Sequence, residues 1–302
     1  MEVNLLISVL EQGMIYGIMS LGVYITYKIL DFPDLTVDGS FPFGAAIAVV
    51  LISKGWNPLF TLPICFLAGA GIGALTGLIH VKLKVRNLLS GIIMMTALYS
   101  INLRIAGKAN FSIFQYDTIF DNKFLNNIFS NRIIPKQLRD YQTVFVILLV
   151  LLTIKYLLDW YLRTKSGFML RAVGDNDTLV TSMGINKGFV KIVGLSIANG
   201  LVALSGCIYA QQQRYFDVSF GTGTVVIGLA SVIIGTSLFK KVTLIRVTSS
   251  VVIGSLIYKG CVALAIFIGL KKSSDLKFIT AVLFLGILVI SMDRKKMVKK
   301  YA

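Results

Sequence analysis

Carboxylates and hydroxyls are concentrated in one short, otherwise apolar stretch, residues 30–40. This stretch contains Asp34, Thr36, Asp38 and Ser40, together with a proline. An ionisable group in apolar surroundings is costly, so it tends to face a cavity, a polar path or a partner group. Side chains of this kind also accept hydrogen bonds from the free N–H groups at a helix start, so capping is the alternative role. For Asp34 both roles stay open.

Other polar and aromatic side chains inside apolar segments are candidates for the same polar path. An amide, hydroxyl or ring in such a place can bind a polar molecule, and hydrogen bonding between neighbouring helices is the alternative for each. The candidates are Met95, Tyr99, Asn102, Asn199, Gln212, Tyr215 and Asp217.

Residues that could carry out a reaction or hold a metal ion form no recognisable motif. Cys65, Cys207 and Cys261 lack CxxC spacing. The single histidine, His80, has no partner motif, and no Gly-rich phosphate loop ending in Lys-Ser or Lys-Thr occurs. We therefore predict no catalytic residue, no metal site and no cofactor in this chain.

The elements that hold these side chains follow from composition. Of the 302 residues, 56% are hydrophobic and 15% are charged, and the mean hydropathy is +0.79, which is too apolar for an ordinary soluble domain. The net charge of +16 does not indicate nucleic acid binding, because Lys and Arg cluster between apolar runs instead of covering one face. We predict an all-α, polytopic membrane protein.

Nine segments are candidates for crossing a bilayer, which takes about 20 mainly apolar residues for a hydrocarbon layer of about 30 Å. The second segment is short and follows the acidic, proline-containing stretch, so we expect it to be broken or partly unwound. The segments are residues 5–27, 39–53, 59–79, 88–106, 142–162, 189–211, 222–239, 244–270 and 276–292.

Glycines spaced four residues apart indicate close contacts between helices. Gly69, Gly73 and Gly77 form one such row, and Gly13 and Gly17 form another. Small residues at this spacing let helix backbones approach closely. Packing within one subunit is the expected use, and dimerisation is the alternative.

Basic clusters between the segments predict the orientation, since Lys and Arg favour the cytoplasmic side. The C-terminus is then cytoplasmic, the N-terminus is extracellular, and residues 108–140 form an external loop. Lys271 and Lys272 fall on the external side against the trend. The four clusters expected in the cytoplasm are His80, Lys82, Lys84 and Arg86; Arg163, Lys165 and Arg171; Lys240, Lys241 and Arg246; and Arg294, Lys295, Lys296, Lys299 and Lys300.

The acidic stretch has an echo in the second half of the chain. Residues 34–40 read Asp-Leu-Thr-Val-Asp-Gly-Ser, and residues 217–223 read Asp-Val-Ser-Phe-Gly-Thr-Gly. An odd number of predicted membrane crossings separates the two stretches, so they would have opposite orientations in the membrane. This predicts an inverted repeat, a design in which the polar path lies between the two halves. We predict a single membrane domain, residues 1–302, divided into a first repeat (1–107), the external loop (108–140), a connecting span with a cytoplasmic loop (141–187) and a second repeat (188–302).

The loop of residues 166–187 is expected to hold a short amphipathic helix. Asp175 or Asn176 can cap its start, and Gly184 can end it. A short tethered helix on the cytoplasmic side is suited to a groove of a partner protein. A helix lying on the membrane surface is the alternative, which its acidic residues disfavour. Its apolar face consists of Leu179, Val180 and Met183.

The same loop carries a resemblance to a known family. Ser166-Gly167, Arg171-Ala172-Val173-Gly174, Asn176 and residues 183–186 are similar to the branched-chain amino acid and ribose permease superfamily of bacterial ABC importers. Residues 34–40 resemble that family's Asp-Leu-Ser-Val-Gly-Ser region, except that Asp38 is inserted before the Gly-Ser pair. Residues 30–44 resemble a subgroup linked to tryptophan or tyrosine uptake.

The resemblance implies a permease subunit in a bacterial plasma membrane that imports a small polar solute, with an aromatic amino acid favoured and a branched-chain one possible. In this family two permease copies bind two cytoplasmic ATPases, and an extracellular lipoprotein delivers the substrate, so ATP and Mg²⁺ are expected on a partner chain. The residues that the resemblance assigns to ATPase coupling are Asp175, Asn176, Asp177, Leu179, Val180, Met183, Gly184 and Ile185.

Two other functions stay open on the sequence. An ion-coupled secondary transporter or channel would use Asp34, Asp38 or Asp217 as an ion or proton site. A membrane scaffold or receptor would move no solute at all. Uptake that survives ATP depletion but collapses with the ion gradient distinguishes the secondary transporter from the importer.

Overall fold

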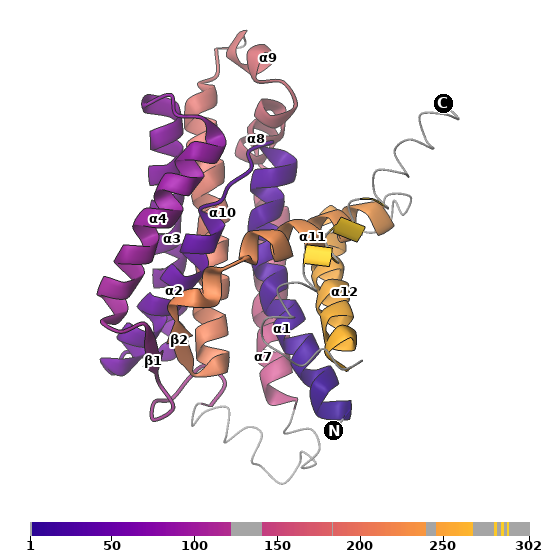
Figure 1. The fold of residues 1–302 in the computed structure, drawn as a ribbon. Coiled ribbons are helices and arrows are strands. Elements are labelled where there is room, and N and C mark those ends of the chain that lie inside the picture. Colours follow the sequence, from indigo (N-terminus) through magenta and orange to yellow (C-terminus); the bar gives the residue numbers. More distant parts are fainter. Residues whose placement is uncertain are drawn as a thin grey trace.

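The structure is a computed structural model that describes residues 2–121, 141–182, 184–239 and 246–267, together with residues 281, 282, 285, 286 and 289. The long helices lie side by side in one bundle, with α8 and α9 at the end opposite the N-terminus and the two strands (Figure 1). In chain order the elements are α1 (Glu2–Val23), the π-helix η1 (Tyr24–Ile29), α2 (Val37–Ser53), α3 (Pro58–Lys82), α4 (Asn87–Ala106), β1 (Asn110–Ser112), α7 (Gln142–Tyr161), α8 (Lys165–Asp175), α9 (Asp177–Ser182), α10 (Lys187–Gln213), β2 (Tyr215–Asp217), the 3-10 helix η2 (Val218–Gly221), α11 (Thr224–Leu238) and α12 (Val247–Phe267).

Seven helical stretches within the described residues are long and apolar enough to cross a membrane, and α2 is a shorter apolar helix. The prediction of an all-α, polytopic membrane protein is confirmed, but the count of nine spans is not. The first eight predicted segments fall on α1, α2, α3, α4, α7, α10, α11 and α12, while the ninth, residues 276–292, lies almost wholly outside the described residues. The seven stretches are Leu6–Ile29, Pro58–Lys82, Asn87–Ala106, Gln142–Tyr161, Lys187–Gln213, Val218–Leu238 and Val247–Ala265.

The predicted break lies ahead of the second segment, and α2 itself is continuous despite Pro42. After η1 the chain returns to mid-height of the bundle without helical structure before α2 begins at Val37 (Figure 1). Pro33 disfavours helical geometry in the residue before it, which accounts for the interruption. The second half follows the same plan, because α10 is followed by a return through β2 and η2 before α11. α1 and α10 pack side by side and run in opposite directions, as an inverted repeat requires (Figure 1).

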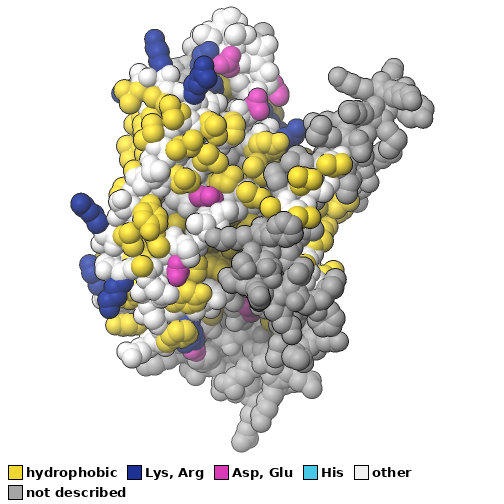
Figure 2. Space-filling model, viewed as in Figure 1, with side chains coloured by type: hydrophobic (Ala, Val, Ile, Leu, Met, Phe, Trp, Pro, Cys, Tyr) yellow, Lys and Arg dark blue, Asp and Glu magenta, His cyan; other side chains and the backbone are white. Residues whose placement is uncertain are grey.

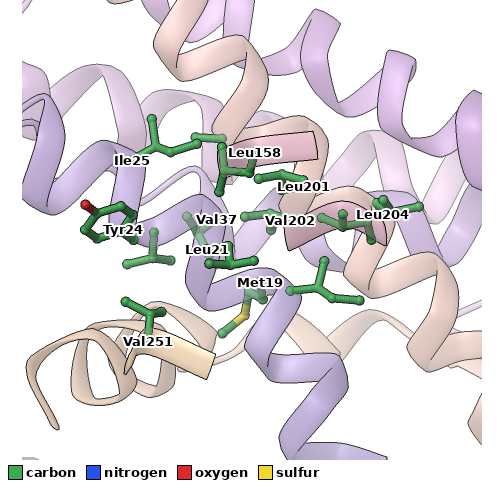
Figure 3. Packing of buried hydrophobic residues seen from close by; sticks show 14 of the residues in the cluster. Met19, Leu21, Tyr24, Ile25, Val37, Leu158, Leu201, Val202, Leu204 and Val251 are labelled. Carbon is green, nitrogen blue, oxygen red and sulfur yellow. The ribbon is translucent and has the colours of Figure 1, made fainter. Parts of the chain in front are cut away.

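α1 and α10 form the centre of the bundle. In their most apolar stretches, 67% and 72% of the residues are buried, against about a third or less in α3, α4, α7 and α12. The core lies where these two helices meet their neighbours: Met19 and Leu21 of α1 pack with Val202 of α10 and Val251 of α12 (Figure 3). The outer helices keep apolar side chains on the surface, and Figure 2 shows hydrophobic residues across the middle of the visible face with Lys and Arg toward its edges. Such a surface fits a bilayer as solvent.

The glycine rows serve packing within the subunit, as predicted. Gly69, Gly73 and Gly77 of α3 all face α10, and Gly13 and Gly17 of α1 face α12. A Cβ atom at Gly73 would overlap a backbone carbonyl of α10. The close approach of these helices therefore depends on the absence of side chains.

Gly44 offers a direct test of this packing. A Cβ atom there would overlap the carbonyl oxygen of Ala203, so Gly44→Ala must push α2 away from α10 and is expected to cost about 1–3 kcal/mol. Gly71→Ala is the matched control, because its Cβ would meet nothing within 4 Å. That variant should be neutral or gain up to about 1 kcal/mol of helix propensity. Thermal unfolding of the detergent-solubilised protein measures both, and equal melting temperatures would contradict the packing model.

Candidate functional site

Asp34 is the centre of a buried hydrogen-bond network that joins the two halves. Its Oδ1 accepts from the backbone N–H of Thr36 at 2.9 Å, and its Oδ2 accepts from Asn199 Nδ2 at 2.8 Å. Asn199 in turn accepts from the Ser40 hydroxyl at 2.7 Å. Asp34 is 5% exposed, and the other three residues are fully buried. Four of the predicted path residues thus come together at the junction of α2 with α10.

Thr36 extends this network to α3, since its hydroxyl lies 3.3 Å from that of Thr76. Thr76 itself donates to the carbonyl of Ile72 at 3.1 Å, so the Thr36 hydroxyl is the donor in that pair. The start of α2 is therefore bonded to two neighbouring helices at once. Its polar groups are satisfied internally, as a membrane interior demands.

Asp38 caps the helix that opens the second half. Its Oδ1 accepts from Val225 N and from the Thr224 hydroxyl, both at 2.8 Å, and its Oδ2 accepts from Gly223 N at 3.2 Å. These groups belong to the first turn of α11 or precede it, where N–H groups have no partner within the helix. The two echoing sequence stretches therefore meet in space. Asp38 thus takes the alternative capping role, and the helix that it caps lies in the other half of the chain.

Three predicted residues on α4 face different surroundings. Asn102 is buried and donates to the carbonyl of Gly39 at 3.2 Å, and within the described residues its Oδ1 has no hydrogen-bond partner. Met95 is half-buried, and its backbone lies close to Gly39. Tyr99 is 55% exposed on the outer surface of α4, so the structure does not bring it to the network.

Tyr215 and Asp217 lie at the end of the bundle in β2. Asp217 accepts from the Ser219 N–H at 2.7 Å and from Asn110 Nδ2 at 3.4 Å. Asn110 is the residue opposite Asp217 in the antiparallel pair of β1 and β2. Asp217 thus caps η2 and fastens β2 to β1, and it is separate from the Asp34 network.

Aromatic rings form a continuous cluster where α1, α2, α10 and η2 meet. Tyr16 stacks on Phe41 at 5.6 Å between ring centroids, and Tyr209 contacts both rings at 5.6 to 5.7 Å. Phe220 then joins Tyr209 to Tyr215 at 5.0 and 5.1 Å. We call these five residues the aromatic cluster.

A cation lies on the cluster from the side of α12. The Lys259 ammonium sits 3.8 Å from the centroid of the Tyr16 ring, a cation–π contact. Its Nζ also approaches the amide oxygen of Gln12 at 3.4 Å. The inner end of the aromatic cluster is therefore positively charged.

A polar cavity of about 230 Å³ lies beside the aromatic cluster, at the same end of the bundle as the strands. Gln212 donates to Glu11 at 2.9 Å across it, and Arg214 pairs with Asp121 at 2.7 Å. The predicted residue Gln212 belongs to this cavity, one helical turn from Tyr209. The cavity is lined by Glu11, Thr118, Phe120, Asp121, Gln142, Thr143, Gln211, Gln212 and Arg214.

The opposite end of the bundle carries the short helix predicted in the loop of residues 166–187. α9 begins after Asn176, whose side chain accepts from the Thr178 hydroxyl at 2.6 Å, and Gly184 ends it with a φ of +78°. The predicted start and stop are thus confirmed. Met183 lies outside the described residues, and Leu179 lies within α9.

The remaining predicted coupling residues divide into an inner and an outer set. Val180 is 1% exposed and Ile185 packs on the same core, so both hold α9 against the bundle. Asp175 and Asn176 are exposed. The exposed side chains of α9 include three hydroxyls, those of Thr178, Thr181 and Ser182.

Asp177 ties α9 to the start of α10, pairing with Lys187 at 3.1 Å and Lys191 at 3.6 Å. The hydrogen bond from Lys187 and the charges of both lysines hold the pKa of Asp177 below its ordinary value of 3.8. A carboxyl whose pKa is lowered by folding stabilises the fold above its unfolded pKa and loses that effect as the pH falls through the folded pKa.

Attachment of α9 is therefore expected to be constant from about pH 5 to pH 8 and to weaken below about pH 3.8. Asp177→Asn should raise hydrogen exchange of the α9 amides severalfold at neutral pH and remove the acid transition. Exchange rates corrected for the intrinsic effect of pH are the measurement. Equal α9 protection in the variant and the wild type at pH 7 would show that the ion pair does not hold the helix.

Two features of the site were not predicted. The aromatic cluster joins residues about 200 positions apart, and only the alternation of aromatic residues with polar ones near Tyr209 and Tyr215 hints at it. α8 lies in the stretch that was read as a loop, and its Thr164 cap, which accepts from Gly167 N at 3.4 Å, is the signal that was available. Among the described residues, no group of three or more His, Cys, Asp or Glu side chains could hold a metal ion.

The chain matches a family described as "Branched-chain amino acid transport system / permease component" over residues 5–292. It is 44% identical to the tyrosine transport system permease protein of Clostridioides difficile, over 94% of this chain and 90% of that protein. It is 26% identical to the ribose import permease protein RbsC of Escherichia coli K12, over 77% and 69% of the two chains. It is also 26% identical to a probable branched-chain amino acid transport permease protein LivH of Methanocaldococcus jannaschii, over 72% and 70%.

No solved structure shows significant similarity to the chain. The family match extends over all the helices described above, including the break before α2 and the α8–α9 segment. Together with its apolar, polytopic architecture, this match shows that the chain is a multi-pass membrane protein and that it belongs to the family of branched-chain amino acid transport system permease components.

Proposed function

We propose that this chain forms the membrane path of an ATP-driven importer of amino acids, with aromatic amino acids favoured. The observation that carries the substrate class is the aromatic cluster beside a cavity lined by carboxylates, amides and an arginine. Carboxylates suit an ammonium group, an arginine suits a carboxylate, and aromatic rings attract another ring by offset or edge contacts. The relative named as a tyrosine transport system permease supports the same substrate class.

The path in this proposal runs from the polar cavity along the junction of the two halves. Tyr209 and Gln212 lie one turn apart on α10, so the aromatic cluster and the cavity are neighbouring parts of one surface. Further in, Asp34 ties the start of α2 to α10, and Asp38 ties it to the start of α11. Rocking of the two halves about this junction would open the path alternately to either side of the membrane, as in other transporters with interrupted helices.

ATP hydrolysis is proposed to take place on a separate cytoplasmic ATPase that carries ATP and Mg²⁺. Contact with it would be made by α8 and α9, so the end bearing residues 165–187 would lie in the cytoplasm and the N-terminus outside. A second copy of this chain and an extracellular substrate-binding lipoprotein would complete the importer. The support is the family resemblance together with the exposed outward face of α9.

The surroundings of Asp34 and Asp38 favour this proposal over an ion-coupled transporter. Both oxygens of each carboxylate accept hydrogen bonds from N–H or O–H groups. A cation site needs several oxygen atoms turned toward the ion, whereas donors surround these carboxylates. Their geometry is that of caps and helix ties.

Uptake into proteoliposomes tests the proposal. The permease, its ATPase and its lipoprotein are reconstituted together, and uptake of labelled tyrosine is measured with tryptophan, leucine and ribose as competitors. The expected result is ATP-dependent uptake that tryptophan inhibits more than leucine does and that ribose leaves unchanged. Uptake that follows an ion gradient without ATP would support the secondary transporter, ribose uptake would refute the substrate class, and no flux of any solute would refute transport.

A further inference from the structure

A basic cavity lies at the end of the bundle that carries α9. Its volume is about 690 Å³, and it lies where α3 ends and both α4 and α10 begin. The polar path described above does not include it. Its lining residues are His80, Val81, Lys84, Val85, Arg86, Asn87, Asn186, Lys187, Gly188 and Lys191.

The charges around this cavity are almost all positive. Lys187 and Lys191 share a single carboxylate, Asp177 of α9. Lys84 and Arg86 are exposed and form no ion pair with any residue in the described ranges. Four cations around one carboxylate leave a net positive site, which favours an anion.

Backbone groups add donors on the side of α4. That helix begins after Arg86 without a side-chain cap, so the first N–H groups of its first turn have no side-chain acceptor. The start of α10 differs, because Asn186 accepts from the N–H groups of Gly188 and Phe189 at 3.0 and 3.2 Å. An uncapped helix start beside two unpaired cations suits a phosphate group.

The position of the cavity selects the source of that phosphate. Its three helices are all candidate membrane spans, so their ends lie at the level of the lipid headgroups. Exposed leucines adjoin its lining residues along the chain: Leu83 is 69% exposed, Leu88 is 50% and Leu89 is 51%. A soluble phosphate compound has no apolar chain that would contact these leucines, whereas the acyl chain of a lipid packs on them.

We propose that this cavity binds the headgroup phosphate of an anionic phospholipid, such as phosphatidylglycerol. Lys84 and Arg86 contact the phosphate, the first turn of α4 donates backbone hydrogen bonds, and the leucines hold the acyl chain. Basic pockets between membrane helices commonly bind anionic headgroups in this way. The side of the membrane is the one on which α9 lies.

The site is linked to α9 through shared lysines. A phosphate in the cavity competes with Asp177 for Lys187 and Lys191, so a bound lipid loosens the ion pairs that attach α9. If α9 contacts the ATPase, as the proposed function has it, anionic lipid then changes ATPase coupling. Lipid binding itself does not depend on that function.

Native mass spectrometry of the purified permease complex tests lipid binding directly. The complex is exchanged into mixed phosphatidylglycerol and phosphatidylcholine, and the retained lipids are counted. Wild type should prefer phosphatidylglycerol, and Lys84→Gln with Arg86→Gln should lower that preference about thirtyfold, as expected for the loss of two cations near a membrane surface. Both side chains are exposed, and an unchanged melting temperature verifies that the variant is folded.

The matched control removes two exposed cations at the other end of the bundle, with Lys54→Gln and Lys108→Gln, and should keep the preference. Equal phosphatidylglycerol retention in the Lys84 and Arg86 variant and the wild type would overturn the proposal. Displacement of the bound anion by inorganic phosphate, with no preference between the two lipids, would also overturn it and assign the cavity to a soluble phosphate compound. Because the readout is lipid retention, a failed uptake experiment leaves this result unaffected.

Discussion

Thr178→Arg together with Thr181→Arg is expected to weaken coupling between the permease and its ATPase about thirtyfold while the permease itself stays inserted and folded. Both side chains lie on the exposed face of α9, three residues apart, and neither belongs to the core. If α9 docks on the ATPase, as the proposed function has it, two arginines add bulk and charge at the contact, where a loss of about 2 kcal/mol corresponds to about a thirtyfold change. ATPase copurification and ATP-dependent uptake should therefore fall together by about that factor.

Ser112→Arg with Gln115→Arg is the matched control for this experiment. These two residues are also exposed, uncharged and three positions apart, and they lie at the opposite end of the bundle. Their replacement should leave copurification unchanged. If the α9 variant still copurified with the ATPase and transported at the wild-type rate, α9 would not be the coupling helix.

Asp34→Asn is expected to produce the second large effect, a loss of transport with a melting temperature lowered by a few degrees. Both carboxylate oxygens accept N–H groups, one from Thr36 and one from Asn199. An amide at position 34 has one oxygen only, so its NH₂ group must face a donor inside a buried network. A buried donor left without an acceptor costs about 1–3 kcal/mol.

Exchange of the two side chains distinguishes this network from a simple requirement for charge at position 34. In the double variant Asp34→Asn, Asn199→Asp, the new amide can donate to the new carboxylate, which still accepts from Ser40. Only the bond from Asn199 to the carbonyl of Leu195 is lost, so stability should be partly restored. Asp31→Asn is the control, because Asp31 is exposed in the same stretch and asparagine tolerates its φ of +49°. Wild-type transport by Asp34→Asn would show that the network is dispensable.

Features encoded within a few consecutive residues were predictable. The apolar segments follow from the length that a bilayer demands, and eight of them correspond to helices. The start of α9 after Asn176 and its end before Gly184 follow from local capping chemistry. The glycine row of α3 follows from its spacing, although the sequence did not reveal that α10 is its partner.

Features that depend on distant contacts were not predictable. Capping of a helix start was an alternative role for Asp38, but the sequence did not indicate that its oxygens bind the start of α11, about 185 residues away in the chain. Tyr99 and Asn199 were both candidates for the polar path because each lies within an apolar segment, but Tyr99 is exposed on the outer surface of α4. Such outcomes depend on helix rotation and on which helices are neighbours, and helices that are apolar all round encode little of either.

The glycines of α8 show a related limit. Gly167 and Gly174 look like loop residues in the sequence, because glycine lowers helix propensity. In the structure each one allows backbone contact, Gly167 with Tyr161 and Gly174 with Ile29. Tertiary packing thus outweighs a local cost of about 1 kcal/mol per glycine.

The contact between Gly174 and Ile29 has a mechanical consequence. A Cβ atom at Gly174 would overlap the carbonyl oxygen of Ile29, so the backbone of α8 lies directly on the end of η1 with no side chain between them. Flexible side chains at a contact absorb displacement by changing rotamer, whereas two touching backbones cannot. A displacement of α8 is therefore transmitted directly to η1 and to α1, which precedes it, because no side chain in between can absorb it. This direct transmission depends on the absence of a Cβ atom at Gly174.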